Sequence, residues 1–123
     1  MKKVLIVEDE IITALELKSI LERNGYEVAA SAMSGEEAIQ EASAKRPHLI
    51  LMDIGLGGTI DGIETARQIR KKHSVPIIFI SAYSSQNRID EALSVAPGGY
   101  LLKPFEEKDL LSIIRRGLAL KTV

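Results

Sequence analysis

The strongest constraint on the fold is a regular alternation between short apolar runs and longer segments with helical periodicity. Five runs rich in β-branched and other apolar residues occupy residues 4–7, 26–30, 49–52, 75–80 and 100–102. Strict alternation of strand and helix is typical of a parallel sheet covered by helices on both faces. We therefore expect an α/β fold with five parallel strands. The runs are too short to span a bilayer, so no membrane association is expected.

Start and stop residues mark the five helices. The first helix is expected over residues 10–24, with Gly25 as its C-terminal stop. The stretch Ser34-Gly35-Glu36-Glu37 fits a capping box, which predicts a second helix that ends before Pro47. The remaining helices are expected after the Asp61-Gly62 pair as far as residue 72, over residues 85–96 and over residues 106–120.

Composition excludes several classes of protein. A length of 123 residues suits one domain, taken as residues 1–123, and a net charge of -1 gives no general attraction to nucleic acid. The absence of cysteine excludes disulfides, thiol catalysis and cysteine-ligated metals. Acidic residues interrupt the N-terminal apolar run before it reaches signal-peptide length, so we expect a cytoplasmic protein. The chain ends soon after the fifth helix, so no separate output domain is expected.

Polar side chains follow four of the five apolar runs. In open α/β sheets, sites form at the carboxyl ends of strands. We therefore expect carboxylates, a hydroxyl and an ammonium group to converge on one edge of the sheet. The residues concerned are Glu8, Asp9 and Glu10 after the first run, Asp53 after the third, Ser81 after the fourth and Lys103 after the fifth.

Five motifs stand in order at these positions: VEDE, LILMDI, DGIE, FISAY and GYLLKPF. With them, the whole chain resembles a response regulator receiver domain, the phosphoacceptor part of two-component signalling. The resemblance implies a flavodoxin-like, doubly wound, five-stranded parallel sheet with strand order 2-1-3-4-5 and five helices. In that order the first and third strands are neighbours, which brings Glu8 and Asp9 beside Asp53.

The resemblance implies a magnesium site at these carboxylates. Asp9 and Asp53 would bind Mg²⁺ through their side chains, Glu8 directly or through water, and Gly55 through its backbone carbonyl. Magnesium prefers oxygen ligands and is commonly shared with a substrate phosphate. Without a cation, an incoming phosphoryl group would meet at least two negative charges. Each repulsion is worth about 4 kcal/mol at about 4 Å and an effective dielectric of about 20.

The resemblance also implies the chemistry and the switch. Asp53 is the expected nucleophile, since carboxylates can form acyl phosphates. Lys103 would supply positive charge to the phosphoryl oxygens, and Ser81 would donate a hydrogen bond to another of them. As Ser81 moves inward, Tyr100 would move toward the vacated space and change the surface of the fourth helix, fifth strand and fifth helix. The Lys103–Pro104 bond is expected to be cis.

The first helix carries a candidate docking surface. At about 100° per residue, one side of this helix can face the sheet, and that side is formed by Thr13, Leu17, Ile20 and Leu21. Ile11, Ile12 and Leu15 fall away from it, and the resemblance implies that a sensor histidine kinase or histidine phosphotransfer protein contacts this helix. The alternative is that these three residues pack at the edges of the core. An output partner is expected but not identified, and a phosphorylation-dependent homodimer stays open.

The loop at residues 54–62 departs from the family pattern. Many relatives have a proline here and one residue fewer before the Asp-Gly pair. The glycines Gly55, Gly57 and Gly58 make this loop permissive, which bears on loop order and on the lifetime of the phosphorylated state. Glu8 is also longer than the aspartate often found at its position.

Some of these residues also fit simpler structural roles, and the chain can be compared with other functional classes. Acids after the first run could complement the dipole of the first helix, which is the role we expect for Glu10. Ser81 could be an ordinary strand-end serine, and Tyr100 could simply pack at the sheet edge. A dehalogenase-type phosphatase would need a second aspartate where Gly55 stands. A phosphorylation-independent module would be expected if Asp53 or Lys103 were absent. We therefore expect a signalling phosphoacceptor with at most slow self-catalysed phosphorylation and dephosphorylation, not an enzyme.

Overall fold

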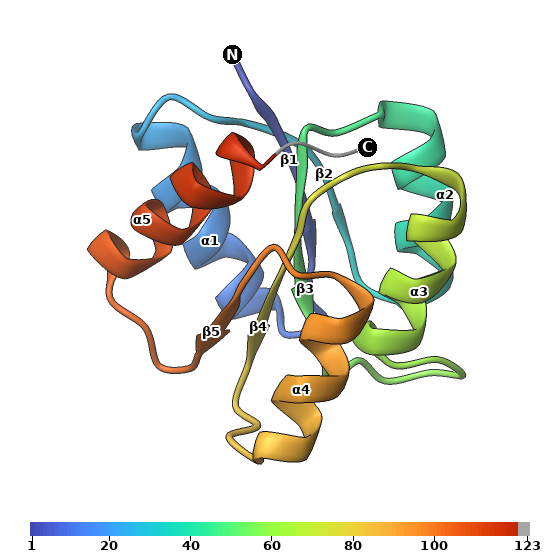
Figure 1. Ribbon diagram of the computed structural model, residues 1–123. Helices are drawn as coiled ribbons and strands as arrows, with labels where there is room; N and C mark the ends of the chain where they lie inside the picture. Colours follow the sequence, from blue (N-terminus) through green and yellow to red (C-terminus); the bar gives the residue numbers. More distant parts are fainter. Residues whose placement is uncertain (121–123) are drawn as a thin grey trace.

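A computed structural model describes residues 1–120. The five strands form one parallel sheet in the order β2-β1-β3-β4-β5 (Figure 1). The strands are β1 (Lys3–Val7), β2 (Glu27–Ala32), β3 (Leu49–Asp53), β4 (Ile77–Ser81) and β5 (Tyr100–Leu102). The helices are α1 (Ile11–Arg23), α2 (Gly35–Lys45), α3 (Gly62–Lys72), α4 (Gln86–Val95) and α5 (Glu107–Ala119). The predicted fold class and strand order are confirmed.

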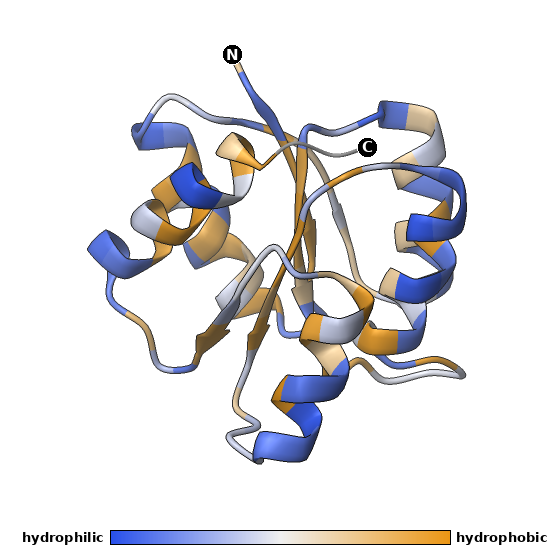
Figure 2. Cartoon of the chain, in the orientation of Figure 1, coloured by the Kyte–Doolittle hydropathy of each residue, from blue (hydrophilic) through white to orange (hydrophobic). Residues whose placement is uncertain are grey.

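Helices cover both faces of the sheet. Helices α1 and α5 lie on one face, and α2, α3 and α4 lie on the other (Figure 1). All residues of β3 and β4 are buried, as expected for strands covered on both sides. The helices are apolar toward the sheet and hydrophilic outward (Figure 2). Among residues 1–120, no helix combines the length and apolar character that a membrane crossing requires.

Local capping fixes where the helices begin and end. The Ser34 hydroxyl accepts a hydrogen bond of 3.1 Å from the Glu37 amide, as the capping box predicts. The Glu37 carboxylate, however, accepts from the Met33 amide at 2.6 Å, one residue before the position that the motif specifies. After α1, Gly25 adopts a left-handed φ of 87°, in keeping with its predicted role as a helix stop.

Two strand boundaries differ from the sequence prediction. Strand β2 starts at Glu27 and continues to Ala32, because a register shift in its pairing with β1 lets Ala32 pair with Val7. Strand β4 starts at Ile77, because the preceding Pro76 has no N–H for the sheet. The Pro76 carbonyl still accepts a hydrogen bond of 3.0 Å from the Ile50 amide.

Candidate functional site

Three carboxylates meet at the carboxyl edge of the sheet. Glu8 and Asp9 follow β1, and Asp53 is the last residue of the neighbouring β3. One carboxylate oxygen from each lies within 4.8 Å of the others. Glu8 and Asp53 are only 1% and 8% exposed, so this negative charge is held largely out of water. The convergence expected from the strand ends is therefore present.

The Lys103 ammonium reaches into this cluster from the end of β5. Its Nζ lies 2.7 Å from Glu8 Oε1 and 3.8 Å from Asp53 Oδ1. The Lys103 amide donates a hydrogen bond of 2.9 Å to the Ser81 carbonyl, which fixes the lysine beside the end of β4. The bond between Lys103 and Pro104 is cis, as expected. Lys103 was expected beside Asp53, but Glu8 is its nearer partner, which was not predicted.

Burial and pairing act in opposite directions on Glu8 and Lys103. Burial raises the pKa of Glu8, and hydrogen bonds from Lys103 and the Glu10 amide reduce this rise without cancelling it. Burial alone would lower the pKa of Lys103, but the hydrogen bond to Glu8 and the charge of Asp53 outweigh it and raise that pKa. Lys103 therefore stays charged at neutral pH. One ammonium group faces more carboxylates than it can neutralise, which leaves the site suited to a further cation.

Glu10 has a lesser part in the cluster. It is the residue before α1, where its side chain makes no capping hydrogen bond. Its Oε1 lies 3.7 Å from Lys103 Nζ, but the side chain is 70% exposed. Its amide donates a hydrogen bond of 3.1 Å to Glu8 Oε2, so the backbone of Glu10 orients the buried acid.

Backbone amides tie the glycine-rich loop to the acidic residues. The Gly55 amide donates to Asp53 Oδ1 at 3.2 Å, and the Gly57 amide donates to Asp9 Oδ2 at 3.1 Å. Ile54 and Leu56 are buried and anchor the start of the loop in the core. The loop is therefore held against the site despite its glycines. The Gly57–Asp9 contact was not foreseen, because no local pattern signals it.

Both predicted switch residues contact Tyr83, which follows β4. Ser81 is fully buried, and its hydroxyl accepts a hydrogen bond of 3.0 Å from the Tyr83 amide. The Tyr100 hydroxyl donates to the Tyr83 carbonyl at 2.8 Å, and the centroid of the Tyr100 ring is 6.4 Å from that of the Phe79 ring. Within residues 1–120, no hydrogen bond joins Ser81 to Asp53. Tyr83 was not predicted to contact either residue.

Arg88 links Tyr83 to the start of α3. Its guanidinium carbon lies 5.6 Å from the centroid of the Tyr83 ring, and its Nη2 lies 3.1 Å from Asp61 Oδ2. Asp61 Oδ1 caps α3 by accepting from the Glu64 amide at 2.9 Å. Partial burial would raise the pKa of Asp61, but the hydrogen bonds from Glu64 and Arg88 outweigh it and hold that pKa below its usual value. The loop after Asp53 and the loop after Ser81 are thus connected through one arginine.

The exposed side of α1 is apolar near the acidic cluster. Leu17, Ile20 and Leu21 are buried against the sheet, as expected. Ile11, Ile12 and Leu15 are 63%, 84% and 59% exposed, so they do not pack at the edge of the core. Met33, after β2, is 49% exposed, and together with Ile11 and Leu15 it lines a pocket of about 200 Å³. Met33 was not predicted as part of this surface, since it lies outside α1.

The fold and this edge define a doubly wound α/β domain with an acidic, lysine-containing site at the carboxyl ends of its strands. The family model for the response regulator receiver domain matches residues 4–115. The chain therefore belongs to the response regulator receiver domain family. Members of this family are phosphoacceptors in two-component signalling that work with histidine kinases and output domains, and magnesium is typical of them.

Curated relatives agree with this assignment. Transcriptional regulatory protein PdtaR of Mycobacterium tuberculosis (strain ATCC 25618 / H37Rv) is 34% identical over 113 residues, which cover 92% of this chain and 55% of that protein. Transcriptional regulatory protein YdfI of Bacillus subtilis (strain 168) is 34% identical over 111 residues, covering 89% of this chain and 52% of that protein. The chain thus spans about half the length of the curated relatives that it matches.

Solved structures show the same fold. The signal receiver domain of a modulated diguanylate cyclase from Desulfovibrio desulfuricans G20 matches with a TM-score of 0.89 and 38% identity, covering 96% of this chain and 94% of that one. A CheY-like response regulator receiver domain protein from Methanospirillum hungatei JF-1 matches with a TM-score of 0.88 and 29% identity, again covering 96% and 94%.

Proposed function

We propose that Asp53 accepts a phosphoryl group, in a Mg²⁺-dependent reaction, from a sensor histidine kinase or histidine phosphotransfer protein. The observation that carries this proposal is the 3.8 Å separation of Lys103 Nζ and Asp53 Oδ1 inside a cluster of carboxylates. Family membership supports it. The chain would act in the cytoplasm, as a phosphoacceptor with at most slow self-catalysed phosphorylation and dephosphorylation.

Transfer requires positioning and charge neutralisation more than covalent help from the protein. An oxygen of Asp53 attacks phosphorus while the bond from phosphorus to the donor histidine nitrogen breaks, and the imidazole leaves with the electron pair. The Gly55 amide orients the Asp53 carboxylate through Oδ1. Lys103 acts as a point charge toward the phosphoryl oxygens. The Ser81 hydroxyl, at the end of the adjacent strand, donates to another phosphoryl oxygen.

The residues present fit a hard divalent cation. Glu8, Asp9 and Asp53 offer only carboxylate oxygens, and these lie within 4.8 Å of one another. Bound Mg²⁺ supplies positive charge that neutralises both the carboxylates and the transferred phosphoryl group. We assign Asp9 and Asp53 as side-chain ligands and the Gly55 carbonyl as a backbone ligand. Glu8, which also pairs with Lys103, would bind the cation directly or through water.

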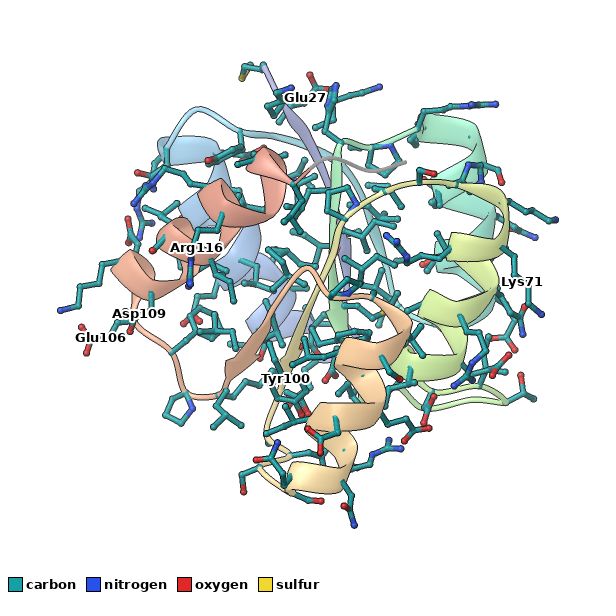
Figure 3. The ribbon with its side chains drawn as sticks, viewed as in Figure 1. Glu27, Lys71, Tyr100, Glu106, Asp109 and Arg116 are labelled. Atoms are coloured by element: carbon teal, nitrogen blue, oxygen red, sulfur yellow. The ribbon has the colours of Figure 1, made fainter. Side chains whose placement is uncertain are left out.

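Intact mass measurement after treatment with acetyl phosphate tests the proposal. We expect a gain of one phosphoryl group with Mg²⁺ and none in excess EDTA, because the carboxylates repel the donor when no cation is bound. Asp9→Ala should remove most of the Mg²⁺ affinity in a titration, whereas Asp109→Ala, an exposed acid on α5, should leave it unchanged (Figure 3). An unchanged titration for Asp9→Ala would contradict the metal assignment.

Tyr83 suggests how phosphorylation would reach the surface. A phosphoryl oxygen on Asp53 would draw the Ser81 hydroxyl and so alter its contact with the Tyr83 amide. Tyr100 also bonds to Tyr83, so its position would change with that loop. We propose that the surface of α4, β5 and α5 then binds an output partner or a second copy of the chain. No direct contact with nucleic acid or membrane is proposed.

We propose that Ile11, Ile12 and Leu15 dock the phosphodonor protein. Leu15→Asp should slow transfer from the cognate phosphodonor by about tenfold or more, because it puts a charge into an apolar contact. Labelling by acetyl phosphate, which does not need docking, should keep its rate. Gln40→Asp adds the same charge at an exposed position of α2 and should change neither rate. If Leu15→Asp slowed both reactions equally, α1 would not be the docking surface.

A further inference from the structure

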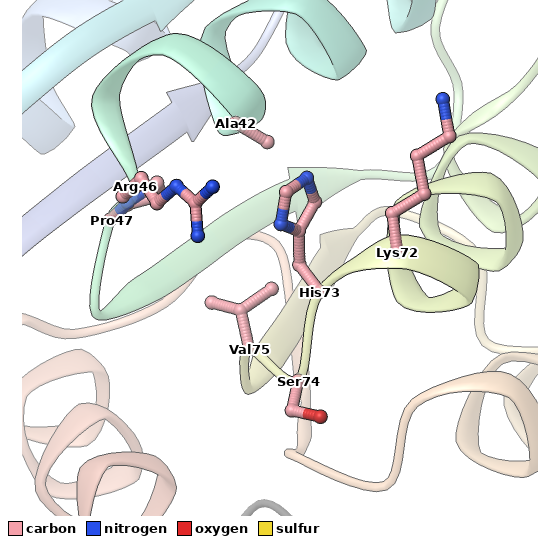
Figure 4. A pocket seen from close by; sticks show the side chains of 7 residues that line it. All are labelled: Ala42, Arg46, Pro47, Lys72, His73, Ser74 and Val75. Carbon is pink, nitrogen blue, oxygen red and sulfur yellow. The ribbon is translucent and has the colours of Figure 1, made fainter.

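A pocket lies at the opposite edge of the sheet from Asp53, where β3 and β4 begin. It encloses about 230 Å³ between the turn that follows α2 and the turn that follows α3 (Figure 4). Its apolar wall is formed by Ala42, Pro47 and Val75. Because both turns precede strands, the pocket shares no residue with the acidic site and owes nothing to the proposed phosphorylation.

The polar residues of this pocket are cationic or hydrogen-bond donors. Arg46, Lys72 and His73 line it, and none of its lining residues is acidic. Within residues 1–120, neither the Arg46 guanidinium nor the Lys72 ammonium has a carboxylate oxygen within 4.0 Å. The pocket therefore holds positive charge that the described chain does not neutralise, which favours an anion.

Arg46 and His73 face one another across the pocket. His73 Nε2 lies 3.1 Å from the Ser43 hydroxyl, so Nδ1 is the ring nitrogen left for the pocket. Figure 4 shows a ring nitrogen of His73 directed toward the Arg46 guanidinium. A guanidinium can only donate hydrogen bonds, and Nδ1 also donates when the Ser43 hydroxyl donates to Nε2. In that tautomer two donors face each other, and an oxyanion between them would accept from both.

The backbone at Arg46 is an independent indication of a role for its side chain. Its φ of 48° and ψ of 61° lie in the left-handed region, and the next residue is Pro47, which disfavours helical conformations before it. Glycine adopts this conformation without steric cost. The helix dipole accounts for a cation such as Lys72 in the last turn of α3. It does not account for an arginine in a strained conformation that faces His73.

We propose that this pocket binds a small phosphomonoester. The phosphoryl oxygens would lie between Arg46 and His73, since the guanidinium fork matches two phosphate oxygens. The Lys72 ammonium, which points away from the pocket in Figure 4, would contribute charge at longer range. The organic part would pack against Ala42 and Val75. The volume is below the range of about 300–1,000 Å³ typical of sites for drug-sized molecules, so the ligand is small.

Amide chemical shifts during a titration with phenyl phosphate test this proposal on the full chain. EDTA in the buffer keeps the acidic site from taking up a cation and phosphate. We expect saturable shifts at residues 42–46, 48 and 72–75, since Pro47 has no amide proton. Arg46→Gly should weaken binding by about tenfold or more, as expected for loss of a charged hydrogen-bond donor. Lys71→Ala, on the outer side of α3 (Figure 3), should change affinity by less than about twofold.

Arg46→Gly also separates binding from folding. Glycine keeps the left-handed turn and relieves its strain, so this variant should unfold at the same or a higher temperature while it loses the ligand. Shifts that do not saturate, or that survive in Arg46→Gly, would overturn the proposal. A third result would also overturn it: the chain does not respond to phenyl phosphate but sediments with phosphatidic acid vesicles, and Arg46→Gly abolishes that sedimentation. This result would assign the pocket to a lipid headgroup.

Discussion

Replacing Asp53 with asparagine should abolish acid-labile phosphorylation by acetyl phosphate in the presence of Mg²⁺. The amide is nearly the same size as the carboxylate but lacks its negative charge, so it can neither attack phosphorus nor serve as an anionic cation ligand. Intact mass should show no phosphoryl adduct. The substitution removes a negative charge close to Lys103. The variant should still fold, because Lys103 retains its closer partner, Glu8.

Asp61→Asn is the matched control for this variant. Asp61 lies in the loop after Asp53, and replacing it with asparagine makes the same change of charge. Unlike Asp53, it caps α3 and pairs with Arg88. Asparagine caps helices about as well as aspartate, so folding should be maintained. This variant should still be labelled by acetyl phosphate. Labelling that survived in Asp53→Asn would place the acceptor at another residue.

The alternation of apolar runs was sufficient to predict the fold class, because a parallel strand covered on both faces must be almost continuously apolar. Strands β3 and β4 meet this condition fully. The predicted strand boundaries were wrong where a strand is not covered on both faces. Strand β2 lies at the edge of the sheet, where only its last residue is buried, so its apolar pattern does not mark its end at Ala32. The strand order came from the family resemblance, since alternation alone does not specify which strands are neighbours.

The site was predictable to the level of strand ends and no further. The carboxyl ends of all parallel strands in one sheet lie at the same edge, which is why Asp53 after β3 and Lys103 after β5 were expected together. The pairing of Lys103 with Glu8 depends on side-chain reach and burial, which the sequence pattern does not encode. The contacts of Tyr83 and Gly57 arise from loops whose paths depend on the packed structure. Their sequence neighbours give no signal of these partners.

One glycine connects the stability of the fold to the position of the phosphoacceptor. Gly62 is the first residue of α3, and a Cβ there would lie 2.0 Å from the Asp53 carbonyl oxygen and 2.8 Å from the Ile54 Cα. Both neighbours are backbone atoms of buried residues, and Asp53 is paired with Ile80 in the sheet. Neither can move away as a flexible side chain would. The start of α3 must therefore shift, together with the Gly62–Ile54 hydrogen bond of 2.9 Å.

Gly62→Ala should consequently lower the free energy of unfolding by about 3 kcal/mol or more, at or above the upper end for overpacked sites. Chemical denaturation measures this directly. Gly57→Ala is the control, because its Cβ would meet only Asp9 Oδ2 at 3.6 Å, an ordinary contact, and we expect a loss of about 1 kcal/mol or less. The folded fraction of Gly62→Ala should also be labelled more slowly by acetyl phosphate, since displacement of a reacting group by about 1 Å can cost about 100-fold in rate. Equal stability of the two variants would mean that α3 can retreat without strain, and the close approach of Gly62 would then not be what holds Asp53 in place.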